Sequence, residues 1–198
     1  MSVCSRIGIH PQFPNCLTTF PDPDRDSWWV IDEWIANETL ASQIGAYSDR
    51  NALFSLGRQL AEGLQAAHEV DVILREMSAS NILIADADQR PVFADFELAK
   101  LVDEYPTVSP EDWPENPYRA PEIGAGDPFP NADIYSWGRI MVEATLGELP
   151  PAGQEGIALK FFEDSPLWIE LLCQCTKLVS SERPQSANQL LDHLRRVL

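Results

Sequence analysis

The sequence predicts an α+β fold that is mainly helical and carries a small β element near its N-terminus. Residues 13–20 and 28–35 are rich in aromatic and β-branched residues, and a Pro/Asp turn at residues 21–26 separates them, which is typical of two paired strands. From residue 51 onward, apolar residues recur at steps of three and four, the spacing of helices with one buried face. Two strands are too few to be stable alone in water, so most of the core is expected among the helices.

Four segments are predicted to be helical. The first spans residues 51–69, and its apolar stripe consists of Leu53, Leu56, Leu60, Leu64 and Ala67. The second spans residues 133–146 and ends at Gly147; its broad apolar face predicts a central, buried helix. The third begins at Ser165, which precedes an N1 proline. The fourth begins at Ser186, which forms a capping box with Gln189.

Two further segments complete the pattern. Residues 82–84 and 91–94 are short apolar runs around the turn-forming residues 86–89, which predicts a hairpin. Residues 103–131 are dense in proline, which excludes regular structure over most of that span. These prolines are Pro106, Pro110, Pro114, Pro117, Pro121, Pro128 and Pro130. A long irregular loop of this kind is usually functional or disordered.

The composition limits the classes of partner and compartment. The net charge is −17, which disfavours binding to nucleic acid and favours a basic protein or peptide partner, although the acidity is equally explained by solubility alone. The sequence contains no apolar run of the roughly 18 to 20 residues that a membrane span needs. Its first residues lack the basic region and apolar run of a signal peptide, so we expect a cytoplasmic protein. The four cysteines have no metal-ligand or disulfide spacing and are expected to be buried thiols.

Several motifs occur in an order that points to one family. Leu74-Arg75-Glu76 followed by Asn81 resembles the catalytic loop H-R-D-L-x-x-x-N of protein kinases, and the segments at residues 95–97 and 120–122 resemble D-F-G and A-P-E. Asp133 begins a segment similar to the family's central helix. The resemblance is to the protein kinase superfamily, specifically to a Ser/Thr-kinase-like large lobe, and it covers roughly residues 10–198. It implies a remnant of the small lobe and hinge at residues 1–38 and a large lobe at residues 39–198.

The resemblance also implies roles for individual residues. Arg75 and Glu76 occupy the catalytic position, where the family places an Asp as the base; Asn81 and Asp95 occupy the positions of the two metal ligands and have oxygen donors of the kind that Mg²⁺ prefers. Glu33 and Ile35 lie in the segment that resembles the hinge and are the implied cofactor-binding residues. Arg183 lies where the family places the arginine that pairs with the A-P-E glutamate, here Glu122, and His68 lies where the long helix ends.

The sequence departs from the family at the positions that perform the chemistry. It has no G-x-G-x-x-G motif, and its only lysines, Lys100, Lys160 and Lys177, follow the D-F-G position. Glu76 is one methylene longer than the family's Asp, which matters where near-attack geometry is needed. The other departures are Asp32 at the back of the implied adenine pocket, Ser78 in place of a Lys, Glu97 in place of a Gly, and Glu115 in place of a Thr. ATP and Mg²⁺ are therefore expected to bind weakly or not at all. The alternative for Asn81 and Asp95 is that they hold the loop by hydrogen bonds.

Three interpretations of function remain open at this point. The first is a catalytically impaired, pseudokinase-like module that binds protein; the second is a Ser/Thr protein kinase completed by a small lobe on another chain; the third is a fragment whose small lobe is encoded upstream. Trp28, Trp29 and Trp34 either fold back onto the large lobe or form an exposed patch for a partner. Tyr105, Thr107 and Ser109 are either phosphorylation sites, with Arg75 as the receiving cation, or ordinary loop residues.

Overall fold

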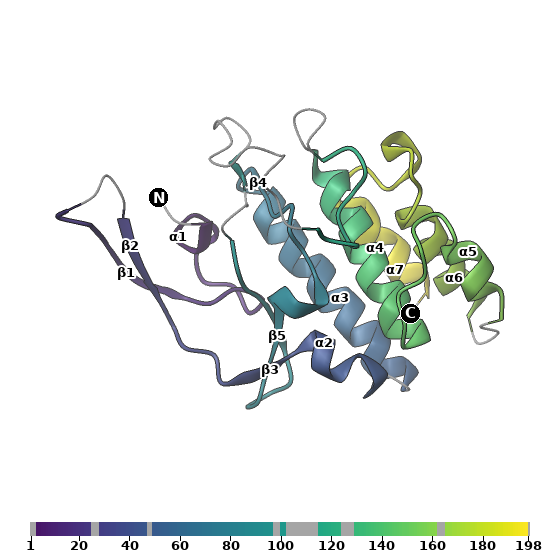
Figure 1. Ribbon diagram of the computed structural model, residues 1–198, viewed down its shortest axis with the longest axis horizontal. Helices are drawn as coiled ribbons and strands as arrows, with labels where there is room; N and C mark the ends of the chain where they lie inside the picture. Colours follow the sequence, from purple (N-terminus) through teal and green to yellow (C-terminus); the bar gives the residue numbers. More distant parts are fainter. Residues whose placement is uncertain are drawn as a thin grey trace.

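The computed structural model describes residues 3–24, 28–46, 49–96, 100–101, 115–123, 129–161 and 165–197. Helices pack together in the C-terminal part, and a hairpin projects from the N-terminal part (Figure 1). The α-helices are α1 (Val3–Ile7), α2 (Leu40–Gln43), α3 (Arg50–His68), α4 (Pro130–Leu146), α5 (Glu155–Ala158), α6 (Pro166–Cys175) and α7 (Ala187–Val197). The 3-10 turns are η1 (Ile44–Ala46), η2 (Ala79–Asn81), η4 (Leu159–Phe161) and η5 (Ser180–Glu182). The predicted α+β class is confirmed.

The strands of the described residues form three small antiparallel sheets. In the first, β1 (Cys16–Pro21) pairs with β2 (Trp28–Asp32). The second contains β3 (Asn37–Thr39), β5 (Ile82–Ala85) and β6 (Pro91–Phe93), and the third pairs β4 (Val72–Ile73) with β7 (Lys100–Leu101). The predicted strand pair and the predicted hairpin are both confirmed, with shorter strands in the first. β3 was not predicted from the sequence.

Helix α4 is the centre of the core. Every residue from Asn131 to Val142 is buried, which confirms the prediction of a central helix. It packs against α3 and α6, and the indole Nε1 of Trp137 donates a hydrogen bond to the Gly57 carbonyl of α3 at 2.9 Å. The helix begins three residues earlier than predicted because Pro130, with its fixed φ, occupies the first turn. It ends as predicted at Gly147, which has φ 79°.

The other helices surround α4 through their apolar faces. Helix α3 contacts α4, α7 and the β6 strand. A side chain at Gly63 of α3 would place its Cβ 2.6 Å from the Phe93 ring, so this glycine allows the sheet to approach the helix closely. Helix α6 begins after Ser165 and α7 begins after Ser186, as predicted, and the Ser186 hydroxyl accepts a hydrogen bond from the Gln189 amide at 3.3 Å.

The β1–β2 hairpin, in contrast, is mostly exposed. Trp28 is 67% exposed, Trp29 54% and Trp34 87%, so these side chains do not fold back onto the helices. No helix among the residues that the structure describes is long and apolar enough to cross a membrane. Most of the proline-dense segment lies outside the described residues, as do Glu97, Tyr105, Thr107 and Ser109.

Candidate active site

The carboxylate of Asp133, which is fully buried on α4, anchors the loop at residues 74–81. Asp133 Oδ2 accepts from the Leu74 amide at 2.9 Å, and Oδ1 accepts from the Arg75 amide at 2.8 Å. The Nε2 of His68, at the C-terminal end of α3, lies 3.0 Å from Asp133 Oδ2. One carboxylate therefore joins the end of α3 and the start of the loop to the central helix, and charge-assisted bonds of this kind are among the strong ones.

Two residues of the candidate site have unusual backbone conformations. Arg75 has φ 65° and Asp95 has φ 59°, both in the left-handed region that residues with a Cβ seldom adopt. Such conformations persist only where the surrounding structure holds them, and they cluster at active sites. For Arg75, the holding contact is the bond from its own amide to Asp133, and its side chain is buried.

Glu76, at the position of the base, is engaged by the loop that follows residue 115. The Nε of Arg119 donates to Glu76 Oε1 at 2.7 Å, and the Nη2 of Arg119 also contacts Oε1. The side-chain amide of Asn116 donates to the other oxygen, Oε2, at 3.0 Å. The Glu76 side chain is only 10% exposed. Both carboxylate oxygens are thus occupied by donors from one segment.

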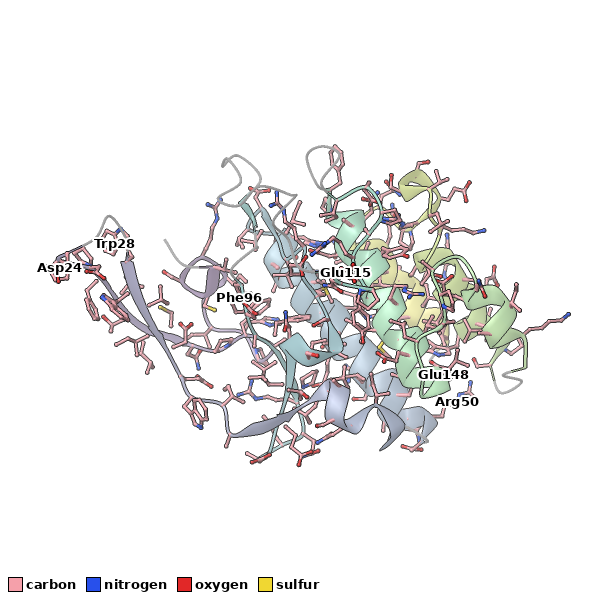
Figure 2. All side chains as sticks on the ribbon, in the orientation of Figure 1. Asp24, Trp28, Arg50, Phe96, Glu115 and Glu148 are labelled. Atoms are coloured by element: carbon pink, nitrogen blue, oxygen red, sulfur yellow. The ribbon has the colours of Figure 1, made fainter. Side chains whose placement is uncertain are left out.

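The sequence did not predict Arg119 and Asn116 as partners of Glu76. It singled out the neighbouring Glu115 instead, and the Glu115 side chain is exposed (Figure 2). Arg119 and Asn116 are 43 and 40 residues away from Glu76 in the chain, so no periodicity connects them to it. The sequence offered one indication of this contact: Arg119 lies beside the A-P-E motif, and Glu76 replaces the usual acid in the catalytic loop.

Asn81 and Asp95 are brought together by the β5–β6 hairpin. The Asn81 side-chain amide donates to the Glu76 carbonyl at 3.1 Å, and the Ala94 amide donates to the Asn81 carbonyl at 2.8 Å. Asp95 follows Ala94 directly, and its side chain is exposed. Asn81 Oδ1 and the Asp95 carboxylate are each oxygen donors of the kind that Mg²⁺ prefers. Among the described residues, no three His, Cys, Asp or Glu side chains group as a metal site. Asn81 does hold the loop, and its role toward a metal stays a prediction.

The two predicted hinge residues lie against the other side of the same hairpin. The Glu33 carboxylate accepts from the Asn15 amide at 3.2 Å and lies 3.6 Å from the Arg90 guanidinium. Ile35 is buried against Ala85 and Val92 of β5 and β6. Both residues connect the β1–β2 hairpin to the rest of the chain, and their role toward a cofactor stays a prediction.

The segment at residues 115–123 is fastened to the helices by Arg183. Its Nη1 and Nη2 donate to the two oxygens of Glu122 at 2.6 and 2.9 Å, and its guanidinium carbon lies 4.7 Å from the centre of the Tyr135 ring. Arg183 is 2% exposed. The predicted pairing of Arg183 with Glu122 is confirmed. Arg139 and Glu155 form a buried ion pair at 2.6 Å, and Arg139 Nε also donates to the Pro117 carbonyl of the same segment at 3.1 Å.

These features together define a protein kinase domain: a loop of the catalytic type held by a buried Asp, followed by a segment that is held by a buried Arg paired with a partly exposed Glu. The protein kinase domain model matches residues 1–196, and the chain belongs to this family.

Its relatives include Ser/Thr protein kinases from bacteria. A probable serine/threonine-protein kinase of Clostridium acetobutylicum is 27% identical, over 85% of this chain and 28% of the relative. The serine/threonine-protein kinase PknA of Mycobacterium tuberculosis is 34% identical, over 70% of this chain and 33% of PknA. The calcium/calmodulin-dependent protein kinase type 1 of Macrobrachium nipponense is 30% identical, over 82% of this chain and 49% of the relative. The chain thus spans less than half the length of these relatives.

Proposed function

We propose that this protein kinase domain is catalytically impaired and acts as a pseudokinase-like module that binds another protein. The observation that carries the proposal is the state of Glu76. A base in phosphoryl transfer must accept a proton from the incoming hydroxyl, which requires a carboxylate oxygen within hydrogen-bond reach of that hydroxyl. Here Arg119 donates to Oε1 through both Nε and Nη2 and Asn116 donates to Oε2, so a substrate hydroxyl is left with only the second acceptor site of Oε2.

The remaining contacts support a structural role for the same loop. Asp133 of α4 holds the catalytic loop, and Arg183, which precedes α7, holds the segment at residues 115–123. Glu76 joins these two parts to each other through Arg119. Removing one partner of a shielded ion pair leaves an uncompensated charge, so loss of either Glu76 or Arg119 is expected to destabilise this arrangement. A rigid surface of this kind is suited to binding, and the net charge of −17 favours a basic protein partner.

The second candidate function is an ATP-dependent Ser/Thr protein kinase that is truncated here or completed by another chain. The oxygen donors of Asn81 and Asp95 favour it, as do the Ser/Thr kinases among the relatives. In that case Asn81 and Asp95 would hold Mg²⁺, Glu33 and Ile35 would contact the nucleotide, and Glu76 would accept the proton, with Arg75 beside it. Bound Mg²⁺ would neutralise charge on the transferred phosphate.

Nucleotide binding separates the two candidates. We expect the melting temperature of the chain to change by less than about 1 °C in about 5 mM ATP and Mg²⁺. If the chain had a nucleotide site and the ligand concentration were about 100 times its Kd, the melting temperature would rise by roughly 5 to 10 °C. Phosphate incorporation from labelled ATP into a generic basic substrate should equal the background given by Asp95→Ala. Asp86→Ala, on the exposed turn of the same hairpin, is the matched control.

Two results would contradict the proposal. One is a saturable thermal shift that Asp95→Ala removes and Asp86→Ala retains. The other is phosphate incorporation that depends on Asp95 and Glu76. Either result would instead support the second candidate.

A further inference from the structure

Arg139 is a buried cation on the central helix α4, and its guanidinium contacts two other parts of the chain. Its Nη1 donates to Glu155 Oε1 of α5 at 2.6 Å, and its Nε donates to the Pro117 carbonyl at 3.1 Å. Both side chains of the ion pair are buried, with 2% of Arg139 and 3% of Glu155 exposed. A charge removed from water needs a charged partner, so the place of Glu155 decides where the guanidinium lies.

The Pro117 carbonyl belongs to the turn that carries both partners of Glu76. The Arg119 amide donates to the Asn116 carbonyl at 3.1 Å, and the Tyr118 amide donates to Asn116 Oδ1 at 2.9 Å, so residues 116–119 form one hydrogen-bonded turn. The side chains of Asn116 and Arg119 both donate to Glu76. Any displacement of this turn therefore moves both donors of Glu76 together.

A second acid lies near Arg139 on the same helix. Glu143 is four residues after Arg139, the spacing at which opposite charges on a helix can pair. In the structure, Glu143 Oε2 instead accepts from the Tyr118 hydroxyl at 2.5 Å. Burial and this hydrogen bond raise the pKa of the Tyr118 phenol well above its usual value, and the charge of Arg139 opposes the shift. Tyr118 thus occupies Glu143 while Arg139 pairs with Glu155.

We propose that Arg139 switches between Glu155 and Glu143, and that this switch couples α5 to the contacts of Glu76. Paired with Glu155, Arg139 also holds the 116–119 turn, and the turn covers Glu76. Displacement of α5 or loss of the Glu155 charge lets Arg139 pair with Glu143 instead. The turn then loses its contacts with both side chains of α4 and leaves Glu76. Two discrete arrangements of one buried cation are the kind of element through which distant sites are coupled.

The inference rests on the proposed function, because it regulates the contacts that keep Glu76 from a substrate. A partner that binds and displaces α5 would release the 116–119 turn, so the binding module would change the surface around its own catalytic loop. The coupling energy is limited by the difference between the two pairings of Arg139, since a ligand shifts an equilibrium only by its differential affinity for the two states.

Native-state hydrogen exchange of the Tyr118 and Arg119 amides tests the switch, because both amides donate within the turn. Glu155→Gln keeps the shape of the side chain and removes its charge. In this variant both amides should exchange at least about tenfold faster than in wild type. Adding Glu143→Gln removes the alternative partner of Arg139, so the double variant should exchange at least about threefold more slowly than Glu155→Gln alone. A pair with a merely structural role predicts a double variant that exchanges as fast or faster.

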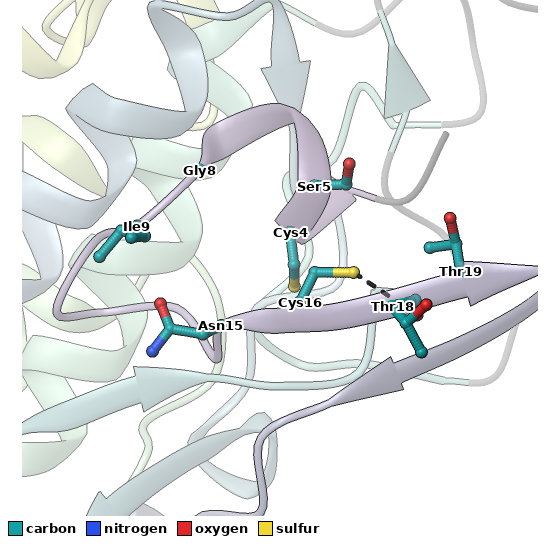
Figure 3. Close-up of a pocket in the computed structure, with 8 residues that line it drawn as sticks. All are labelled: Cys4, Ser5, Gly8, Ile9, Asn15, Cys16, Thr18 and Thr19. Carbon is teal, nitrogen blue, oxygen red and sulfur yellow. Dashed lines mark hydrogen bonds between the residues drawn. The ribbon is translucent and has the colours of Figure 1, made fainter.

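Two control variants separate the switch from a general loss of stability. Glu148→Gln removes the same charge at an exposed residue after α4 and should leave both exchange rates unchanged (Figure 2). Cys4→Ala truncates a buried side chain at a cavity of about 280 Å³ between α1 and β1, which none of the residues of the switch lines (Figure 3). This variant should lose stability through its lost packing. Adding Glu143→Gln to Cys4→Ala should not slow exchange in the turn.

The switch is overturned if the two amides exchange equally fast in Glu155→Gln and wild type, or if Glu143→Gln does not slow them in the Glu155→Gln chain. Should Glu155→Gln not fold, Glu155→Asp gives the same test, since it keeps the charge and withdraws it by one methylene. Slowing by Glu143→Gln in the Cys4→Ala chain as well would also contradict the switch. None of these results involves nucleotide, whereas an Asp95-dependent thermal shift with ATP would overturn the proposed function and leave the exchange rates as they are.

Discussion

Replacing Asp133 by alanine is expected to destabilise the chain more than any other single loss of polar contacts in the core. The carboxylate is fully buried and accepts from the amides of Leu74 and Arg75 at 2.9 and 2.8 Å and from His68 at 3.0 Å. Each buried donor that is left without a partner costs about 1–3 kcal/mol. The two amides and the imidazole together predict a loss of about 3–9 kcal/mol, a large part of the roughly 5–15 kcal/mol by which domains are stable.

The free energy of unfolding, measured by urea denaturation and far-UV circular dichroism, checks this magnitude. Asp133→Asn should lose about half as much, since it retains one acceptor oxygen and turns a donor toward the second amide. Ser136→Ala is the matched control, because Ser136 is buried on the same helix and its hydroxyl donates to the Ala132 carbonyl within that helix, at 3.4 Å. If Asp133→Ala loses less than about 1 kcal/mol, or no more than Ser136→Ala, then Asp133 does not anchor the loop.

Two further outcomes are expected from buried charges and thiols. Arg183→Lys should lower the free energy of unfolding by about 3 kcal/mol, because an ammonium cannot reproduce the fork that binds both oxygens of Glu122; Arg195→Lys, at an exposed pair on α7, should change it by less than about 0.5 kcal/mol. Burial raises the pKa of the Cys4 thiol from 9.0 to about 12. Between these pH values the unfolded chain releases a proton that the folded chain keeps, so the free energy of unfolding falls as the pH rises above 9. Between pH 8 and pH 10, wild type should therefore lose about 1 kcal/mol more than Cys4→Ser, as measured by urea midpoints, and equal losses in the two proteins would contradict this account.

The four longest helices, α3, α4, α6 and α7, were predictable because their apolar periodicity or capping residues mark them, whereas the short helices α1, α2 and α5 were not predicted. The stripe of α3 and the buried length of α4 follow from the sequence alone, and the glycine at 147 marks the helix end. β3 was not predictable in the same way. Its three residues, Asn37–Thr39, contain no apolar alternation, and they form a strand only because β5 lies beside them.

The candidate site was predictable where motifs fix local geometry and not where distant segments meet. The spacing between Glu76 and Asn81 places both in one loop, and the structure joins them through the Asn81 amide and the Glu76 carbonyl. The contacts of Glu76 with Arg119 and Asn116 depend on how the segment at residues 115–123 packs. That packing is set by Arg183 and Arg139, which lie far from Glu76 in the sequence. Tertiary packing therefore decides what the altered acid contacts.

A charged residue of the family pattern can have two uses: it can stabilise the fold, or it can take part in phosphate transfer. The motifs alone do not distinguish these two uses, but the contacts in the structure do. Asp133 and Arg183 are buried charges with all their contacts inside the fold, so their conservation of the family pattern follows from stability and says nothing about phosphate transfer. Glu76 is the residue where the two uses compete, because the same two oxygens that would receive a proton now join the catalytic loop to the following segment. The three donor groups of Arg119 and Asn116 leave only the second acceptor site of Oε2 for a substrate hydroxyl. The chain has the architecture of a protein kinase domain, and under the proposed function its base position serves that architecture.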